Sequence, residues 1–78
     1  MNKALIYSTA TCPYCVLAKR LLDEKKIPYT EIRVDLDDSE RDKMISLTGR
    51  RTVPQVFIDY KHIGGYDDLY AYFNNNSQ

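Results

Sequence analysis

Two cysteines near the start of the chain could form a redox-active dithiol. Cys12 and Cys15 are the only cysteines among the 78 residues, and they enclose Pro13 and Tyr14. An apolar, strand-like run precedes the pair and a helical pattern follows it, so we expect both sulfurs at the start of a helix. Unpaired backbone N–H groups and the positive end of the helix dipole favour a thiolate at that position.

The spacing also predicts different roles for the two sulfurs. We expect Cys12 to be the exposed nucleophile and Cys15, one turn further into the helix, to be the resolving cysteine that attacks a mixed disulfide on Cys12. A purely structural disulfide is the alternative, but closing so short a loop removes little entropy from the unfolded chain. We predict no metal site, because a structural zinc usually needs four ligands and the only histidine, His62, is distant in sequence.

Length and composition predict a small globular protein. A chain of 78 residues is expected to form one domain over residues 1–78. Eleven basic residues balance eleven acidic ones, which argues against a nucleic-acid or membrane-surface partner. No secretion signal is recognisable, and no apolar run approaches the ~20 residues of a membrane span, so we expect a cytoplasmic protein.

The charges are distributed unevenly along the chain. Residues 1–51 hold ten Lys and Arg against eight Asp and Glu, a net charge of +2. Residues 52–78 hold one lysine against three aspartates, a net charge of −2. Arg50 and Arg51 form an adjacent basic pair at the end of the first part.

The hydrophobic pattern predicts strands and helices in the order βαβαββα. We expect strands over residues 4–7, 29–35, 56–58 and 62–63, and helices that begin at Pro13, after Ser39 and near Asp67. Ser39 and Asp42 resemble a capping box for the second helix. We expect Leu47 on its buried face and Gly49 just beyond its end.

Three separate motifs resemble those of the small dithiol glutaredoxins of bacteria. They are Cys-Pro-Tyr-Cys at 12–15, Thr-Val-Pro at 52–54 and Gly-Gly-Tyr-Asp-Asp at 64–68. Their order and spacing match that family, and the resemblance covers essentially the whole chain. It implies an α/β, thioredoxin-like fold, in which helices flank a four-stranded mixed sheet. The strand order would be 2-1-3-4, with a right-handed crossover between the first two, parallel strands.

The resemblance also implies a function. The chain would be a glutathione-dependent disulfide oxidoreductase that reduces protein–glutathione mixed disulfides and protein disulfides. Glutathione would be its co-substrate, and its partners would be glutathionylated or disulfide-bonded proteins, with ribonucleotide reductase as one candidate. We expect it to act as a monomer.

The motif at residues 52–54 suits the binding of an extended peptide such as glutathione. A residue before proline favours extended backbone, so Val53, with Thr52 and Pro54 on either side, can pair with a peptide as if adding a strand. The resemblance implies that the Val53–Pro54 bond is cis and faces Cys12. From the residues alone, a loop proline that starts a strand is the alternative.

The third motif can bind an amino-acid headgroup at both of its charges. Free N–H groups around Gly65 and Tyr66 can receive the γ-glutamyl carboxylate, while the Asp67 carboxylate takes the ammonium group. The alternative is a glycine turn followed by an acidic residue that only suits the helix dipole. Tyr14 would flank the same groove, unless its ring simply packs on its neighbours.

Two positions depart from the pattern of the family. Many of its members carry a lysine three residues before the first cysteine, where it meets the glycyl carboxylate of glutathione, and here that residue is Thr9. We predict that Arg51 takes its place because a guanidinium binds a carboxylate bidentately; Arg50 and Lys19 are weaker candidates. A solvated basic pair is the alternative. Tyr66 stands where many members have Cys, Ser or Thr, which can alter access to the groove.

Two other functions remain open at this level. A thioredoxin-like electron carrier, served by a flavoprotein reductase, would use the same dithiol without a headgroup site at residues 65–67. A dimeric iron–sulfur carrier would use Cys12 of each protomer and two glutathione thiolates as ligands, although Pro13 makes it the less favoured function by resemblance.

Overall fold

Strands and helices alternate along the chain in the predicted order βαβαββα, and the computed structural model describes residues 3–75. The strands are β1 (Ala4–Ser8), β2 (Tyr29–Arg33), β3 (Gln55–Ile58) and β4 (Lys61–Gly64). The helices are α1 (Pro13–Glu24), α2 (Asp38–Thr48) and α3 (Tyr66–Asn75). The predicted α/β, thioredoxin-like fold is therefore confirmed. Within residues 3–75, none of the helices is long and apolar enough to cross a membrane.

The strands form one mixed four-stranded sheet in the order β2-β1-β3-β4. β1 pairs in parallel with β2 and antiparallel with β3, and β3 pairs antiparallel with β4. This order puts β1 inside the sheet, where apolar residues on both faces suit a strand covered from both sides. It puts β2 at an edge, where Glu31 and Arg33 discourage pairing with another chain. The strand order implied by the resemblance is confirmed.

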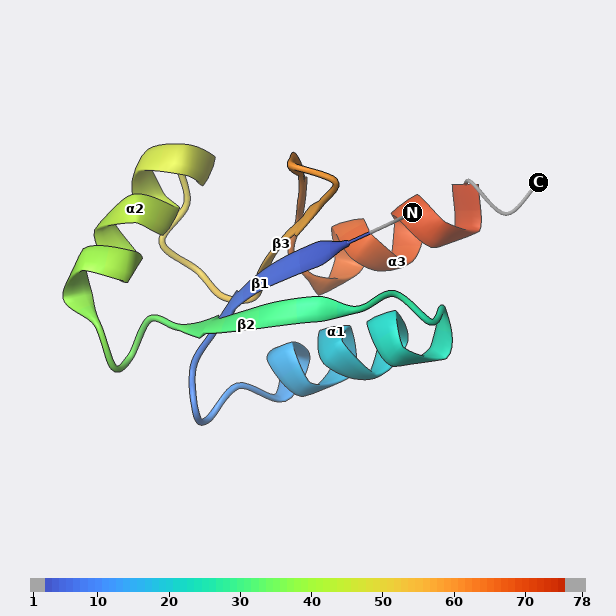
Figure 1. Ribbon diagram of the computed structural model, residues 1–78, viewed down its shortest axis with the longest axis horizontal. Coiled ribbons are helices and arrows are strands. Elements are labelled where there is room, and N and C mark those ends of the chain that lie inside the picture. The colour runs from blue at the N-terminus through green and yellow to red at the C-terminus, as the bar shows by residue number, and fades with distance from the viewer. Residues whose placement is uncertain (1–2, 76–78) are drawn as a thin grey trace.

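Helices cover both faces of the sheet (Figure 1). α1 and α3 pack together against one face through a core that includes Ile6, Leu22 and Leu69. α2 lies over the other face, toward one end of the sheet, where Tyr7 and Met44 belong to a smaller core cluster. The active-site cysteines therefore begin a helix that is anchored on the larger of the two cores.

The start of α2 differs from the prediction. Asp37, not Ser39, is the N-cap, and its carboxylate accepts both the Ser39 backbone N–H at 2.9 Å and the Ser39 hydroxyl at 2.6 Å. The predicted capping box of Ser39 and Asp42 is therefore wrong, because the Ser39 hydroxyl, which would have capped the helix, donates to Asp37 instead. Leu47 was expected to be buried but is 55% exposed, since α2 covers only part of the sheet. Gly49 ends the helix in a left-handed conformation, as predicted.

The connection from β4 to α3 depends on Gly64. Its φ is 127°, a region that is essentially restricted to glycine. A Cβ on Gly64 would lie against the Oδ2, Cγ and Cβ atoms of Asp68. Asp68 in turn accepts the Gly65 N–H at 3.1 Å, so the absence of a side chain at Gly64 lets this carboxylate reach the start of α3.

We expect Gly64→Ala to lower the free energy of unfolding more than Gly49→Ala does. Gly49 also has a positive φ, 72°, but a Cβ there would meet nothing within 4 Å. Its substitution should cost only the backbone strain of about 1–2 kcal/mol, whereas Gly64→Ala adds the displacement of Asp68. Urea denaturation of the two oxidised variants measures the difference. Equal losses would show that neither the backbone conformation of Gly64 nor the displacement of Asp68 adds a cost beyond that at Gly49.

Candidate active site

Cys12 and Cys15 lie at the N-terminus of α1 and are joined by a disulfide, with their Cα atoms 5.2 Å apart. Cys12 is the N-cap, and its sulfur accepts the backbone N–H of Cys15 at 3.1 Å. Pro13 lies in the first turn, where its missing N–H costs no hydrogen bond. The structure thus places both sulfurs at the helix start, as the spacing predicts.

The two sulfurs differ in access. Cys15 is 1% exposed, whereas Cys12 is half-buried at the surface end of the helix. A sulfur atom of another molecule can therefore approach Cys12 but not Cys15. This difference follows from the helix itself, because Cys15 lies on the face of α1 that carries the buried residues Ala18 and Leu22.

The Thr-Val-Pro segment lies beside Cys12. The Val53–Pro54 peptide bond is cis, as the resemblance implies. The Val53 carbonyl oxygen lies 3.8 Å from Cys12 Sγ, and Pro54 is buried while Val53 is half-buried. Two segments some forty residues apart are therefore brought together around one sulfur atom.

Gln55 holds this segment in place. The residue is 1% exposed, and its Nε2 donates to the carbonyl oxygen of Thr52 at 3.1 Å and to its Oγ1 at 3.3 Å. Gln55 Oε1 lies 2.8 Å from Nε2 of His62 on β4. Burial, aided by the nearby Arg50 charge, lowers the pKa of His62, so the ring is neutral at neutral pH. Gln55 was not among the residues predicted from the sequence. A polar residue next to the proline, at the start of an apolar strand, could have indicated its role.

A groove of about 210 Å³ opens between the start of α1, the segment around Pro54 and the start of α3. It is lined by Tyr14, Arg50, Thr52, Val53, Pro54, Gln55, Gly65, Tyr66, Asp67 and Asp68. The structure therefore brings together every predicted glutathione-binding residue except Arg51. A larger cavity of about 420 Å³ lies on the α2 face of the sheet, but its lining includes no residue of the Cys-Pro-Tyr-Cys motif and none of the Thr-Val-Pro segment that lies beside Cys12, whereas the groove is lined by residues of both.

The start of α3 is partly satisfied from within the protein. Asp68 Oδ2 accepts the Gly65 N–H at 3.1 Å and Arg50 Nη1 at 3.2 Å. The hydrogen bond from Arg50, followed by that from Gly65, lowers the pKa of the Asp68 carboxyl, which stays ionised. The N–H groups of Tyr66 and Asp67, which follow in the first turn, have no acceptor within the helix. The sequence analysis missed this cap, which an acidic residue three positions after Gly65 could have indicated.

The three basic candidates for the glycyl carboxylate have different surroundings. Arg50 lines the groove but is paired with Asp68. Lys19 is paired with Glu31 at 2.9 Å. Arg51 is exposed and does not line the groove, and no ion pair with another residue of the 3–75 range holds it. Of the three, Arg51 has the guanidinium that is not already committed to a carboxylate.

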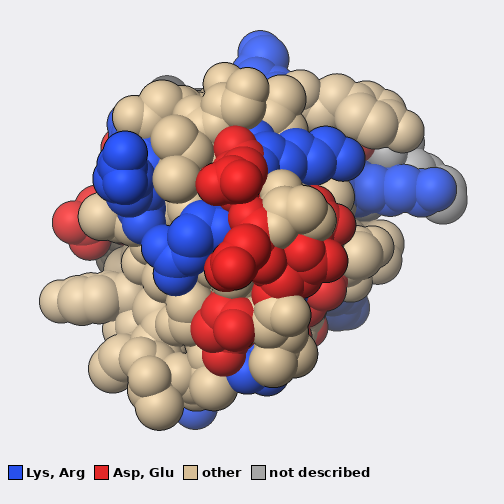
Figure 2. Space-filling model, turned by 90° about the vertical axis from the view of Figure 1, so that its left-hand side faces the viewer, with Lys and Arg blue, Asp and Glu red and all other residues tan. Residues whose placement is uncertain are grey.

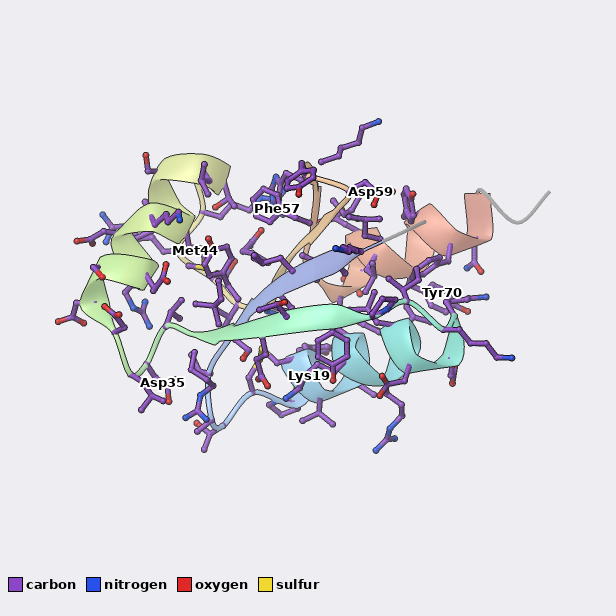
Figure 3. All side chains as sticks on the ribbon, viewed as in Figure 1. Lys19, Asp35, Met44, Phe57, Asp59 and Tyr70 are labelled. Atoms are coloured by element: carbon purple, nitrogen blue, oxygen red, sulfur yellow. A yellow bond between two sulfur atoms is a disulfide. The ribbon has the colours of Figure 1, made fainter. Side chains whose placement is uncertain are left out.

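A hydrogen-bonded cluster ties α1 to the edge of the sheet. The buried Ser8 hydroxyl, at the end of β1, donates to Glu31 Oε2 at 2.5 Å, and Lys19 Nζ of α1 donates to the same oxygen at 2.9 Å. The bond from Ser8, followed by that from Lys19, lowers the pKa of the Glu31 carboxyl. Figure 3 shows Lys19 between α1 and β2. The ionised Glu31 therefore joins the strand and the helix that flank Cys12.

A second carboxylate holds the loop that precedes Cys12. Asp35 accepts the Ala10 backbone N–H at 3.3 Å and the Arg33 guanidinium at 2.7 and 2.6 Å. The Arg33 hydrogen bonds are the main reason that the pKa of Asp35 is lowered to about 2. Figure 2 shows this end of the molecule, where Asp and Glu side chains form a band flanked by Lys and Arg. The ion pair with Arg33 and the bond from Ala10 thus fix the loop to the end of β2.

No group of three or more His, Cys, Asp or Glu side chains within residues 3–75 is arranged to hold a metal ion. The chemistry that this site displays is that of two sulfurs at a helix start beside a peptide-sized groove.

The sequence comparisons all match this chain to glutaredoxins. A family model described as Glutaredoxin matches residues 4–63. Glutaredoxin 3 of Escherichia coli (strain K12) is 53% identical over 71 residues, which are 91% of this chain and 86% of that protein. Glutaredoxin 1 of Rickettsia prowazekii (strain Madrid E) is 49% identical over 77 residues, with 90% of this chain and 81% of that protein covered.

Solved structures show the same similarity. A buckwheat glutaredoxin–glutathione complex matches with a TM-score of 0.85 and 35% identity, covering 95% of this chain and 70% of that chain. The solution structure of a glutaredoxin from Brucella melitensis matches with a TM-score of 0.81 and 40% identity, covering 96% of this chain and 82% of that chain.

The Glu31 cluster predicts a specific dependence of stability on pH. A carboxyl whose pKa is lower in the folded than in the unfolded state contributes stability above the unfolded value, here 4.5, and loses it as the pH falls through the folded value. We therefore expect the native chain to lose stability below pH 4.5 and Glu31→Gln to lose less over the same range.

Urea denaturation at a series of pH values from about 6 down to 3 makes this measurement, with Glu24→Gln as the control for an exposed glutamate of α1. Parallel profiles for the native chain and Glu31→Gln would show that the bonds to Ser8 and Lys19 do not stabilise the fold.

Proposed function

The chain belongs to the glutaredoxin family, and from that premise we propose that it is a glutathione-dependent thiol–disulfide oxidoreductase. Family membership and the Cys12–Cys15 disulfide support disulfide exchange as the reaction. The observation that carries the dependence on glutathione is the groove beside Tyr14, which is lined by residues able to hold an extended peptide and an amino-acid headgroup. A buckwheat relative has been solved as a glutaredoxin–glutathione complex.

The first proposed route uses one cysteine of the reduced enzyme. The Cys12 thiolate attacks the glutathione sulfur of a protein–glutathione mixed disulfide. The protein leaves as a thiolate that takes up a proton, and glutathione stays bonded to Cys12. A second glutathione thiolate attacks that bond, so that glutathione disulfide leaves and the Cys12 thiolate is regenerated. One glutathione thiol is consumed in each turnover: it leaves joined to the glutathione that came from the protein, so the protein–glutathione disulfide is exchanged for glutathione disulfide and the protein thiol is released.

The second route uses both cysteines. Cys12 attacks a disulfide of a protein substrate and forms an intermolecular disulfide. Cys15 then attacks the Cys12 sulfur, which releases the substrate with both of its thiols reduced and leaves the Cys12–Cys15 disulfide seen in the structure. Two glutathiones reduce that disulfide and leave as glutathione disulfide. The burial of Cys15 suits this role, because it reacts only with a sulfur already bonded to Cys12.

The helix start explains why Cys12 can act as a thiolate. Its sulfur accepts the Cys15 N–H, and the positive end of the α1 dipole lies at the same point. Both interactions favour the charged sulfur over the neutral thiol, and the thiolate is the form that attacks disulfides. The same stabilisation makes Cys12 a good leaving group when a second thiolate attacks the mixed disulfide.

The groove, together with Arg51 outside its lining, offers each charged end of glutathione a separate partner. The Val53 backbone, beside Cys12, can pair with the extended cysteinyl part. The N–H groups of Tyr66 and Asp67 can bind the γ-glutamyl carboxylate while the Asp67 carboxylate binds the adjacent ammonium group. Arg51, whose guanidinium is unpaired among the described residues, can bind the glycyl carboxylate.

This function also defines partners and a compartment. The substrates are glutathionylated and disulfide-bonded proteins, and ribonucleotide reductase is a candidate for the second class. A glutathione-dependent reductase requires a pool of reduced glutathione, so the proposal places the chain in the cytoplasm. A carrier served by a flavoprotein reductase would not need the groove, and turnover with glutathione as the only reductant distinguishes the two.

Replacing each cysteine separately with serine should distinguish the route that uses one cysteine from the route that uses both. We expect Cys12→Ser to lose all thiol-transfer activity because Cys15 is only 1% exposed and cannot meet a substrate. Cys15→Ser should keep deglutathionylation but lose the reduction of protein disulfides that need a resolving thiol. Assays with a glutathionylated peptide and with a disulfide-bonded protein measure the two activities. Appreciable deglutathionylation by Cys12→Ser would reverse the assigned roles.

Substitution of Arg51 should weaken glutathione binding without affecting the sulfur chemistry. We expect Arg51→Ala to raise the KM for a glutathionylated peptide and to leave kcat nearly unchanged, because a contact remote from the sulfur contributes uniform binding. A charge-assisted hydrogen bond of ~1.5–3 kcal/mol, reduced by exposure to solvent, corresponds to an increase of several-fold to about tenfold.

Two further variants control this experiment. Thr9→Lys in the Arg51→Ala background should recover part of the binding, because it adds a cation three residues before Cys12. Arg50→Ala tests the neighbouring arginine, which the structure pairs with Asp68. If the KM rises in Arg50→Ala but not in Arg51→Ala, the assignment to Arg51 is wrong.

A further inference from the structure

Three tyrosines form a continuous aromatic surface next to the groove. The ring centroids of Tyr14 and Tyr66 are 6.1 Å apart, and those of Tyr66 and Tyr70 are 6.2 Å apart. Tyr14 is 59% exposed and Tyr70 is 53% exposed, while Tyr66 lies half-buried between them. We call these three residues the tyrosine surface. Tyr66 also packs against the larger core, whereas the exposed rings of Tyr14 and Tyr70 on either side of it indicate a binding surface.

The tyrosine surface begins inside the groove and continues beyond it. Tyr14 and Tyr66 line the groove, whereas Tyr70 does not. Tyr70 lies one turn further along α3, where Figure 3 labels it. Glutathione in the groove would leave Tyr70 uncovered. A substrate protein attached to the same sulfur must extend away from Cys12 in another direction. The exposed ring of Tyr70 is available to contact that protein.

The charge around the tyrosine surface indicates which partner it fits. Exposed tyrosine rings can stack on nucleic-acid bases or on the cationic side chains of a protein. α3 carries Asp67 and Asp68 within its first turn and contains no Lys or Arg. Asp67 is exposed and makes no salt bridge with any described residue. Asp68 is already paired with Arg50, and in the proposed function Asp67 binds the ammonium group of glutathione, so the faces of the rings are what remains to attract a guanidinium or ammonium group of the substrate. The helix itself carries no cation that could hold a phosphate group.

We propose that the tyrosine surface binds a basic segment of the substrate protein, so that the enzyme prefers glutathionylated cysteines that lie next to Arg or Lys. This inference rests on the proposed function and names the class of protein substrate that the same site selects. Tyr66 connects the two exposed rings, and Tyr70 extends the contact beyond the space that glutathione uses.

Three glutathionylated peptides that differ only at the residue beside the cysteine test the proposal. That residue is arginine, citrulline or glutamate; citrulline keeps the shape of arginine without its charge. We expect kcat/KM to be about two- to fivefold higher for the arginine peptide than for the citrulline peptide, which is the range of an exposed cation–π contact, and lowest for the glutamate peptide.

Variants of Tyr70 assign the preference to the tyrosine surface. Tyr70→Ala should bring the arginine and citrulline peptides close together, whereas Tyr70→Phe should keep the preference because it keeps the ring. Tyr60→Ala is the matched control, since Tyr60 is 99% exposed in the turn between β3 and β4 and does not line the groove. The mixed disulfide of glutathione with free cysteine has no peptide segment, and Tyr70→Ala should reduce it as fast as the native chain does.

The outcomes separate this inference from the function on which it rests. Equal kcat/KM for the three peptides, or a preference for the glutamate peptide, would overturn the inference and leave the proposed function intact. A preference for arginine that survives in Tyr70→Ala would also overturn it, because the selection would then come from other residues. Failure of the native chain to reduce any glutathionylated compound would refute the proposed function, and the inference with it.

Discussion

The active site depends on one requirement, that the unpaired N–H groups at the start of α1 find an acceptor. In most helices a side-chain oxygen provides it, but here the sulfur of Cys12 does so by accepting the Cys15 N–H at 3.1 Å. The interaction that begins the helix therefore also holds the nucleophile and favours its negative charge. Burial of Cys15, one turn later, follows from the same helix, because its face toward the sheet forms part of the larger core.

The other two helices meet the same requirement in different ways. Asp37 caps α2 by accepting the Ser39 N–H and has no part in the site. At α3, Asp68 turns back to the Gly65 N–H and is held by Arg50, so the N–H groups that follow stay available to a ligand. Carboxylates thus fix the scaffold around the reactive sulfur, as Glu31 and Asp35 also do on the side of β2. The Cys12 sulfur is thus positioned by a helix start and by carboxylates that hold the segments around it.

The groove and the tyrosine surface divide recognition between two chemistries. In the proposed function, the groove binds glutathione, a small peptide of constant structure, through backbone groups and fixed charges. The tyrosine surface contacts the substrate protein, which is the variable part of a mixed disulfide, through exposed rings that tolerate many geometries. Tyr66 belongs to both, because it lines the groove and contacts Tyr14 and Tyr70. A single side chain at this position can therefore couple the binding of glutathione to the binding of the protein.

Local pattern was enough to predict the order of the elements, the two cysteines at a helix start and the end of α2 at Gly49, because periodicity, caps and glycine conformation act within a few residues of sequence. The family resemblance added the strand order. What the tertiary structure alone decided concerns partners that are distant in sequence. It brought Val53 beside Cys12, paired Arg50 with Asp68 and placed Arg50, not Arg51, in the lining of the groove, while the role of Arg51 stays a prediction. The physical reason is that a charged or polar group binds whichever partner the packed elements bring within about 3 Å, and sequence spacing does not specify that partner.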